Sequence, residues 1–101
     1  MKHKKNTKEK AKFLFDSEND FAILKINDKE YSYSNEIGTI LIDKSSNGEL
    51  SGTRVFDATK FFKMTKKKLA SIREAEIVQT NGSLQIDING KKYSIKQKAI
   101  A

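Results

Sequence analysis

Chemistry in this chain would have to come from carboxylates, lysines and one histidine, because the sequence contains no cysteine. The histidine, His3, lies in a basic N-terminal run, so it leaves little from which to build a zinc site or a histidine-activated nucleophile. The acidic residues form no recognisable pair beside a Gly-rich segment or a histidine. We therefore expect a protein that is not an enzyme and that uses no metal and no cofactor.

Lysines are the side chains whose spacing suggests a function. Three consecutive lysines, Lys66–Lys68, follow Thr65, and Ser71 and Arg73 come shortly after. Lysine and arginine heads bind phosphate oxygens and, where they reach the major groove, the acceptor atoms of guanine. The run predicts either a helix that contacts DNA or the solvated face of a small core helix.

Positive charge is distributed unevenly along the chain, which has 101 residues and a formal net charge of +7. Residues 1–12 hold six Lys and one Glu, whereas residues 13–52 hold three Lys and eight acids. Residues 53–101 hold eleven Lys or Arg and four acids. Such asymmetry favours a polyanionic partner, although lysine-rich composition also serves solubility.

Length and hydropathy predict one compact domain inside the cell. The chain is short enough for a single core, and no apolar stretch approaches the roughly 18 residues of a membrane span. The N-terminal lysines lead into FLFDSEND rather than into a signal-peptide core. We expect a cytoplasmic protein with no membrane partner, in which residues 1–12 form a flexible basic arm and residues 13–101 form one domain.

The fold class expected from local patterns is α+β, with an N-terminal β-meander, a central helix-turn-helix and a C-terminal β-hairpin, or wing. A short helix capped by Thr7 is expected to run from the arm through Phe13–Phe15, into the acidic part at residues 13–52. Strands and a polar loop are then predicted from apolar runs, alternation and turn residues. These strands span residues 21–27, 29–35 and 36–43, and the loop spans residues 44–53.

The basic part, residues 53–96, is expected to contain the helices and the wing. Asp57 would cap the first helix, Lys63-Met64 would form the turn, and Thr65 would cap a second helix reaching about Ala75. Three strands follow, at residues 76–80, 83–88 and 91–96, joined by two Asn-Gly turns that supply the positive φ of tight hairpins. The helix positions expected to be buried are Phe61, Phe62, Leu69 and Ile72. The two turns are Asn81-Gly82 and Asn89-Gly90.

Two ten-residue stretches read alike: Leu24–Tyr33 is LKINDKEYSY and Ile86–Ile95 is IDINGKKYSI. The match is short for a true repeat, and two ordinary hairpins with the same turn chemistry explain it better. The tyrosines Tyr31, Tyr33 and Tyr93 are then expected to pack across strands. Whether the two stretches are a repeat stays open at this point.

The segment from Arg54 to Ile95 resembles the small winged helix-turn-helix units of phage excisionases and mercury-resistance-type regulators. The stretches VFDATKFFKMTKKKLASIREAEIVQ and QIDINGKKYSI carry the resemblance. Lys63 and Ala75 stand where that family commonly has glycine. The matching apolar and capping positions are Val55, Ala58, Phe61, Phe62, Met64, Thr65, Leu69 and Ile72.

The resemblance implies a small DNA-binding regulatory or accessory protein of the phage or mobile-element type, active in transcription regulation. A recognition helix would face the major groove and a basic wing would lie along the phosphates. Whether two copies bind DNA together as a homodimer stays open. The residues expected to contact duplex DNA are Thr65, Lys66, Lys67, Lys68, Ser71 and Arg73 on the helix, Lys91 and Lys92 on the wing, and Lys60 and Lys63 beside them.

The acidic half offers an alternative. A small protein of this composition could instead be a protein-binding inhibitor or adaptor, for example a phage factor directed against host or defence proteins. Its working surface would be residues 13–52, or a sheet edge that accepts a strand from the partner. Loss of the Lys66–Lys68 charges would abolish DNA binding but would spare this second function.

Overall fold

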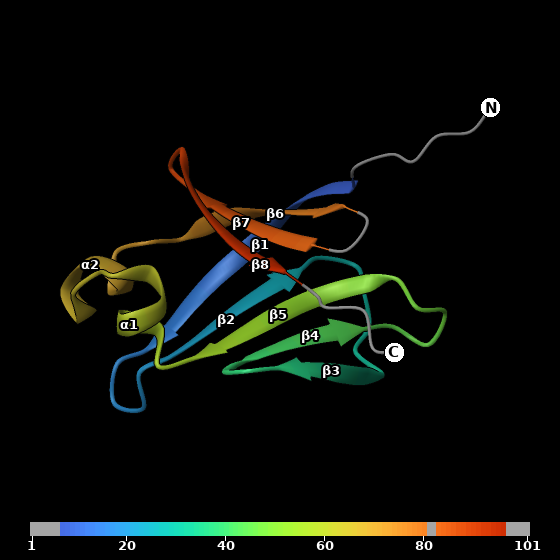
Figure 1. Cartoon of the computed structure of the whole chain (residues 1–101), viewed down its shortest axis with the longest axis horizontal. Helices are drawn as coiled ribbons and strands as arrows, with labels where there is room; N and C mark the ends of the chain where they lie inside the picture. The colour runs from blue at the N-terminus through green and yellow to red at the C-terminus, as the bar shows by residue number, and fades with distance from the viewer. Residues whose placement is uncertain (1–6, 81–82, 97–101) are drawn as a thin grey trace.

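The computed structural model describes residues 7–80 and 83–96, and within them eight antiparallel strands form one curled sheet in the order β3-β4-β5-β2-β1-β6-β7-β8 (Figure 1). Two short helices lie at one end of this sheet. The expected α+β fold with a central helix-turn-helix and a wing is therefore wrong. The elements are β1 Thr7–Asp16, β2 Phe21–Ile26, β3 Tyr33–Ile37, β4 Ile40–Lys44, β5 Leu50–Phe56, α1 Ala58–Phe62, α2 Lys66–Ala70, β6 Glu74–Thr80, β7 Ser83–Ile88 and β8 Lys91–Lys96.

Strand β1 is the centre of the sheet, because it pairs with β2 on one side and with β6 on the other. It joins two groups of strands, β3-β4-β5-β2 and β6-β7-β8, which Figure 1 shows turned toward each other. Their inward side chains form a single core. Alternation builds this face: in β7, Leu84, Ile86 and Ile88 are buried while the residues between them are half-buried.

The N-terminal arm was predicted wrongly from residue 7 onward, because residues 7–12 are the first part of β1. Ala11 and Phe13 are buried, whereas Lys10 and Lys12 are exposed, which is the period of a strand with one face in the core. The helix that Thr7 was expected to cap is a strand for the same reason. Residues 1–6 lie outside the part of the chain that the structure describes.

The acidic part contains a hairpin that local patterns obscured. Gly38 has a φ of 61° and makes the turn between β3 and β4, inside the stretch that was predicted as one strand. The predicted polar loop is also shorter than expected, because β5 begins at Leu50. Thr53 is fully buried and its hydroxyl donates to the carbonyl oxygen of Leu41 at 2.8 Å, so a polar residue belongs to the strand core.

Of the three C-terminal strands, two have the predicted bounds, and β6 begins two residues earlier than predicted, at Glu74. β7 and β8 have the expected bounds, and Asn89 and Gly90 have φ values of 50° and 87°, as a tight hairpin turn requires. Residues 81–82 lie outside the described part. The two similar stretches differ in structure: Ile86–Ile95 is a hairpin, but Leu24–Tyr33 is not, because β2 pairs with β1 and β5 while β3 pairs with β4.

The second helix is shorter than predicted. It ends at Ala70, and the chain is extended again from Glu74. The backbone N–H of Phe13 donates to the carbonyl oxygen of Arg73 at 2.8 Å, which continues the pairing of β1 with β6 back to the end of the helical segment. The residues that would have completed a recognition helix, from Arg73 onward, therefore pair with β1 instead.

Candidate nucleic-acid interface

The helical cap, residues 57–73, is held in place by the turn between β1 and β2. One carboxylate oxygen of Asp20 accepts from the backbone N–H of Thr59 at 2.9 Å, and the other accepts from its hydroxyl at 2.6 Å. Asp57 occupies the N-cap position, as predicted, but its φ is 54° and its side chain makes no capping bond. A carboxylate distant in sequence thus performs the capping that Asp57 was expected to perform.

The ends of α2 use the hydroxyl groups that were expected to contact DNA. Thr65 caps the helix as predicted, since its hydroxyl oxygen accepts from the backbone N–H of Lys68 at 3.1 Å. The hydroxyl of Ser71 donates to the carbonyl oxygen of Lys68 at 2.7 Å. Both side chains therefore satisfy the helix's own backbone, and the cations remain as the groups available for a ligand.

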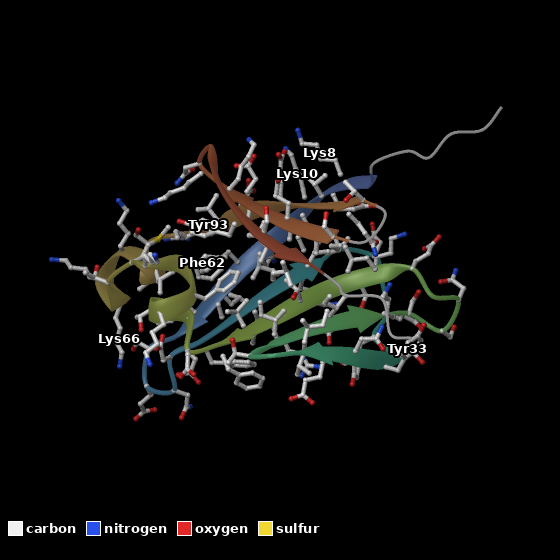
Figure 2. All side chains as sticks on the ribbon, in the orientation of Figure 1. Lys8, Lys10, Tyr33, Phe62, Lys66 and Tyr93 are labelled. Atoms are coloured by element: carbon white, nitrogen blue, oxygen red, sulfur yellow. The ribbon has the colours of Figure 1, made fainter. Side chains whose placement is uncertain are left out.

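An aromatic cluster anchors the cap to the sheet. Phe62 is fully buried, and its ring lies 5.9 Å from Phe13 on β1 and 4.9 Å from Tyr93 on β8, measured between centroids. Figure 2 shows Phe62 and Tyr93 in the space between the cap and the β8 strand. Leu69 is also fully buried and Ile72 is 9% exposed, as their three-residue spacing predicted. The cap is thus a rigid base for its outward side chains.

Six cations project from this base. Every one of them is exposed, and Figure 2 shows Lys66 at the outer end of the molecule. Within residues 7–80 and 83–96, no acidic side chain lies within 4.0 Å of their charged atoms. These cations are Lys60, Lys63, Lys66, Lys67, Lys68 and Arg73.

The two lysines of the predicted wing lie on the β7–β8 hairpin. Lys91 and Lys92 are at the start of edge strand β8. Lys92 pairs with Asp87 at 3.3 Å, so its charge is already partly compensated. The ammonium of Lys91 lies 5.9 Å from the centroid of the Tyr93 ring, which in turn packs on Phe62. Lys91 is thus the wing residue that the structure links to the cap.

Three further cations were missed from the sequence as site residues. Lys10 and Lys12 line a shallow depression of about 400 Å³ together with Asn27, Arg73 of the cap and the acidic residue Glu74. Lys25 lies directly opposite Lys12 in the β1–β2 register. The alternation of lysine with apolar residues along β1 is the signal that indicates them, whereas the high lysine content of this segment favours a loose arm.

Arg54, which opens the segment of the winged-helix resemblance, is occupied within the protein. Its guanidinium donates to Asp43 at 2.7 and 3.0 Å and lies 5.2 Å from the centroid of the Tyr31 ring. The hydrogen bonds to Asp43 raise the pKa of Arg54 above its ordinary value. Asp43 is only 8% exposed, so this pair is part of the sheet structure rather than a contact for DNA.

Within the described residues, no group of three or more His, Cys, Asp or Glu side chains is placed to hold a metal ion. The same part of the chain has no helix long and apolar enough to cross a membrane. Comparison of the sequence and structure with protein-family models, with curated proteins and with solved structures gave no match. A hypothesis about function therefore has to rest on the surface of this molecule alone.

Proposed function

We propose that the protein binds nucleic acid, duplex DNA in particular, through phosphate contacts made by the helical cap. The observation that supports this function is the set of six exposed cations on residues 60–73, none of which has a carboxylate oxygen within 4.0 Å of its charged atoms in the described structure. Phosphate neutralisation by Lys and Arg, with release of counterions, supplies most of the affinity of nonspecific DNA binding.

Phosphate binding fits this geometry better than reading of bases. Helix α2 has five residues, which corresponds to a length of about 7.5 Å, so it offers few positions from which side chains could reach base edges in the major groove. The hydroxyls of Thr65 and Ser71 are used by the helix ends. Lysine ammonium groups on flexible stems need no fixed approach to a phosphate, so a short, rigid cap is sufficient to present them.

The first experiment measures fluorescence anisotropy of a mixed-sequence duplex at several salt concentrations. If all six cap cations contact phosphates, the slope of log K against log salt should be about −5. The test variant is Lys66→Glu/Lys67→Glu/Lys68→Glu. Its matched control is Lys8→Glu/Lys29→Glu/Lys44→Glu, which changes the net charge equally but leaves every cap cation in place.

We expect the cap variant to lose binding at salt concentrations where the control still binds. A folded wild-type protein that does not bind at low salt would refute the proposal. Equal losses in both variants would mean that net charge, and not the cap, attracts the DNA. Duplexes of different sequence should bind alike, because phosphate contacts carry no direct sequence information.

A second candidate function is recruitment of a protein through the sheet edge. β3 is an edge strand whose only partner among the described strands is β4, and Tyr31 and Tyr33 beside this edge are 59% and 44% exposed. An extended peptide can add to such an edge. A partner captured in this way should be lost with Tyr33→Ala/Glu36→Lys and retained with the Lys66–Lys68 variant; the reverse pattern would exclude the edge.

A further inference from the structure

The depression of about 400 Å³ beside the cap carries an excess of positive charge. Three cations, Lys10, Lys12 and Arg73, line it, together with one acid, Glu74. All four side chains are exposed. Because Arg73 belongs to the cap and the two lysines belong to β1, the depression lies where the cap meets the sheet.

Strand alternation places a pair of lysines on the outer face of the sheet at this point. Lys12 lies between Ala11 and Phe13, which are both buried in the core, and side chains on adjacent positions of a strand point to opposite faces. Directly opposite Lys12 is Lys25 of β2, whose neighbour Leu24 is also buried. We call Lys12 and Lys25 the cross-strand lysine pair.

The cross-strand lysine pair brings two like charges together without compensation. Like charges directly opposite each other on neighbouring strands destabilise a sheet. Within the described residues, no carboxylate oxygen lies within 4.0 Å of either ammonium group. The Lys25 ammonium instead reaches a neutral acceptor, the carbonyl oxygen of Lys29, at 3.3 Å. The pair therefore costs the fold stability, whereas a bound anion would compensate both charges.

The strands on either side leave this charge in place. On β6, Glu74 lies directly opposite Lys12, but its carboxylate forms no ion pair within 4.0 Å in the described structure. On β5, the residue opposite Lys25 is Gly52, which has no side chain. The uncompensated positive charge thus lies on β1 and β2, and the acid on β6 marks its limit.

We propose that duplex DNA bound at the helical cap extends onto the outer face of β1 and β2, where the cross-strand lysine pair binds further phosphates. This extension rests on the proposed function, because it enlarges the same phosphate-binding surface. Arg73 connects the two parts: it lines the depression, and its carbonyl oxygen accepts from the backbone N–H of Phe13 at 2.8 Å. Since α2 also packs against β1, the cap and the pair are held next to each other.

A nucleic-acid backbone fits this surface better than an isolated anion does. The cations extend from the cap across β1 to β2, so a ligand that meets them all must carry a row of negative charges. Duplex DNA carries about one charge per 1.7 Å of its axis. If both lysines of the pair contact phosphates in addition to the six cap cations, the slope of log K against log salt should be about −7 instead of about −5.

The test measures the salt dependence of binding to the same mixed-sequence duplex by fluorescence anisotropy. The variant Lys12→Gln/Lys25→Gln removes both charges of the pair and adds no negative charge, so a lost phosphate contact lowers the slope without new repulsion. The control, Lys8→Gln/Lys29→Gln, makes the same change in net charge at two lysines whose ammonium groups already pair with Glu76 and Glu49.

We expect slopes of about −7 for the wild type and the control and about −5 for the pair variant. Between about 50 and 200 mM salt, the affinity of the wild type should then fall about tenfold more than that of the pair variant. The pair variant should also unfold at no lower urea concentration than the wild type, because it removes a like-charge repulsion.

Three outcomes would overturn this extension while leaving the cap as the DNA-binding site. They are a wild-type slope of about −5, equal slopes for the pair variant and the control, and a pair variant that is less stable than the wild type, which would assign the pair to the fold. A wild type that binds no duplex at low salt would refute the proposed function and the extension together.

Discussion

Tyr93 shows how a single side chain connects the helical cap to the sheet. Its ring contacts Phe62 edge-on, and its hydroxyl is buried with no hydrogen-bond partner in the described structure. Burial raises the pKa of this hydroxyl above its ordinary value of 10.0. Because the neutral form is the one that the interior accepts, the phenolate is disfavoured in the folded protein.

The substitution Tyr93→Phe should therefore be tolerated at neutral pH and should change the alkaline stability. Removal of an unpartnered hydroxyl leaves the free energy of unfolding unchanged or raises it by up to about 1 kcal/mol. The pKa of Tyr93 is higher in the folded protein than in the unfolded chain. Its contribution to the free energy of unfolding is therefore fully present below the unfolded pKa, about 10, and is lost as pH rises above that value. Guanidinium unfolding of both proteins on either side of that pH measures the difference. If wild type and Tyr93→Phe lost the same free energy of unfolding above pH 10, the raised pKa of Tyr93 would be contradicted.

At the scale of elements, β5 and β2 approach more closely than most residues permit. Gly52 lies opposite Lys25 in the register, and a Cβ atom at this position would be 2.4 Å from the carbonyl oxygen of Leu24. That oxygen belongs to the backbone of a strand paired on both sides. The pairing of these two strands therefore depends on the absence of a side chain at position 52.

We expect Gly52→Ala to lower the free energy of unfolding by about 2 kcal/mol or more, since the clash requires a backbone shift in β2 or β5. The neighbouring substitution Ser51→Ala is the control, because the Ser51 hydroxyl is buried without a partner in the described structure and its loss removes no bond. Urea denaturation of the two variants tests this prediction. Equal stabilities would show that the strands separate without cost.

At the scale of the whole molecule, the cap closes one end of the core. Phe62 contacts Phe13 in the first strand and Tyr93 in the last strand, so a single ring links elements from both ends of the described chain. α2 itself packs against β1. The helices therefore link β1 with the β6-β7-β8 group of strands.

The substitution Phe62→Ala should lower the free energy of unfolding by roughly 3–5 kcal/mol, as removal of a buried aromatic ring generally does. Hydrogen exchange should accelerate in β1 and β8 together, because both strands lose the same contact. Phe56→Ala is the matched control: its ring is 44% exposed, and we expect a loss below about 1 kcal/mol. A loss of protection confined to the cap would contradict this role of Phe62.

Local patterns predicted the elements that depend on neighbouring residues. The Asn89-Gly90 turn, the strand at residues 83–88 and the cap made by Thr65 all follow from interactions within a few residues, and they are confirmed. The pairing of β1 with β6 joins residues more than sixty positions apart, and no residue near Lys10 or Lys12 identifies β6 as the partner strand. The charged outer face of β1 therefore looked like an arm.

The helix-turn-helix prediction was wrong because the local sequence pattern of two short helices, the second with an N-cap, is the same in a helix-turn-helix and in this curled sheet. What differs is the path after Ser71, where β1 pairs with the extended chain and ends the helical segment. The exposure of the Lys66–Lys68 side chains follows from the burial of Leu69 and Ile72 on the opposite face. Their contact with DNA, like that of Lys60, Lys63 and Arg73, stays a prediction.

The central place of β1 also bears on how the protein is made. Synthesis runs from the N-terminus, so β1 to β5 are complete while the strands that cover the other edge of β1 have yet to be translated. At 5–20 residues per second, the residues from the end of β5 to the end of β8 take about 2–8 s. During that interval the nascent half-sheet presents an open strand edge and an uncovered apolar face. Chaperones recognise these features in unfinished chains, and the same features allow nascent chains on neighbouring ribosomes to aggregate.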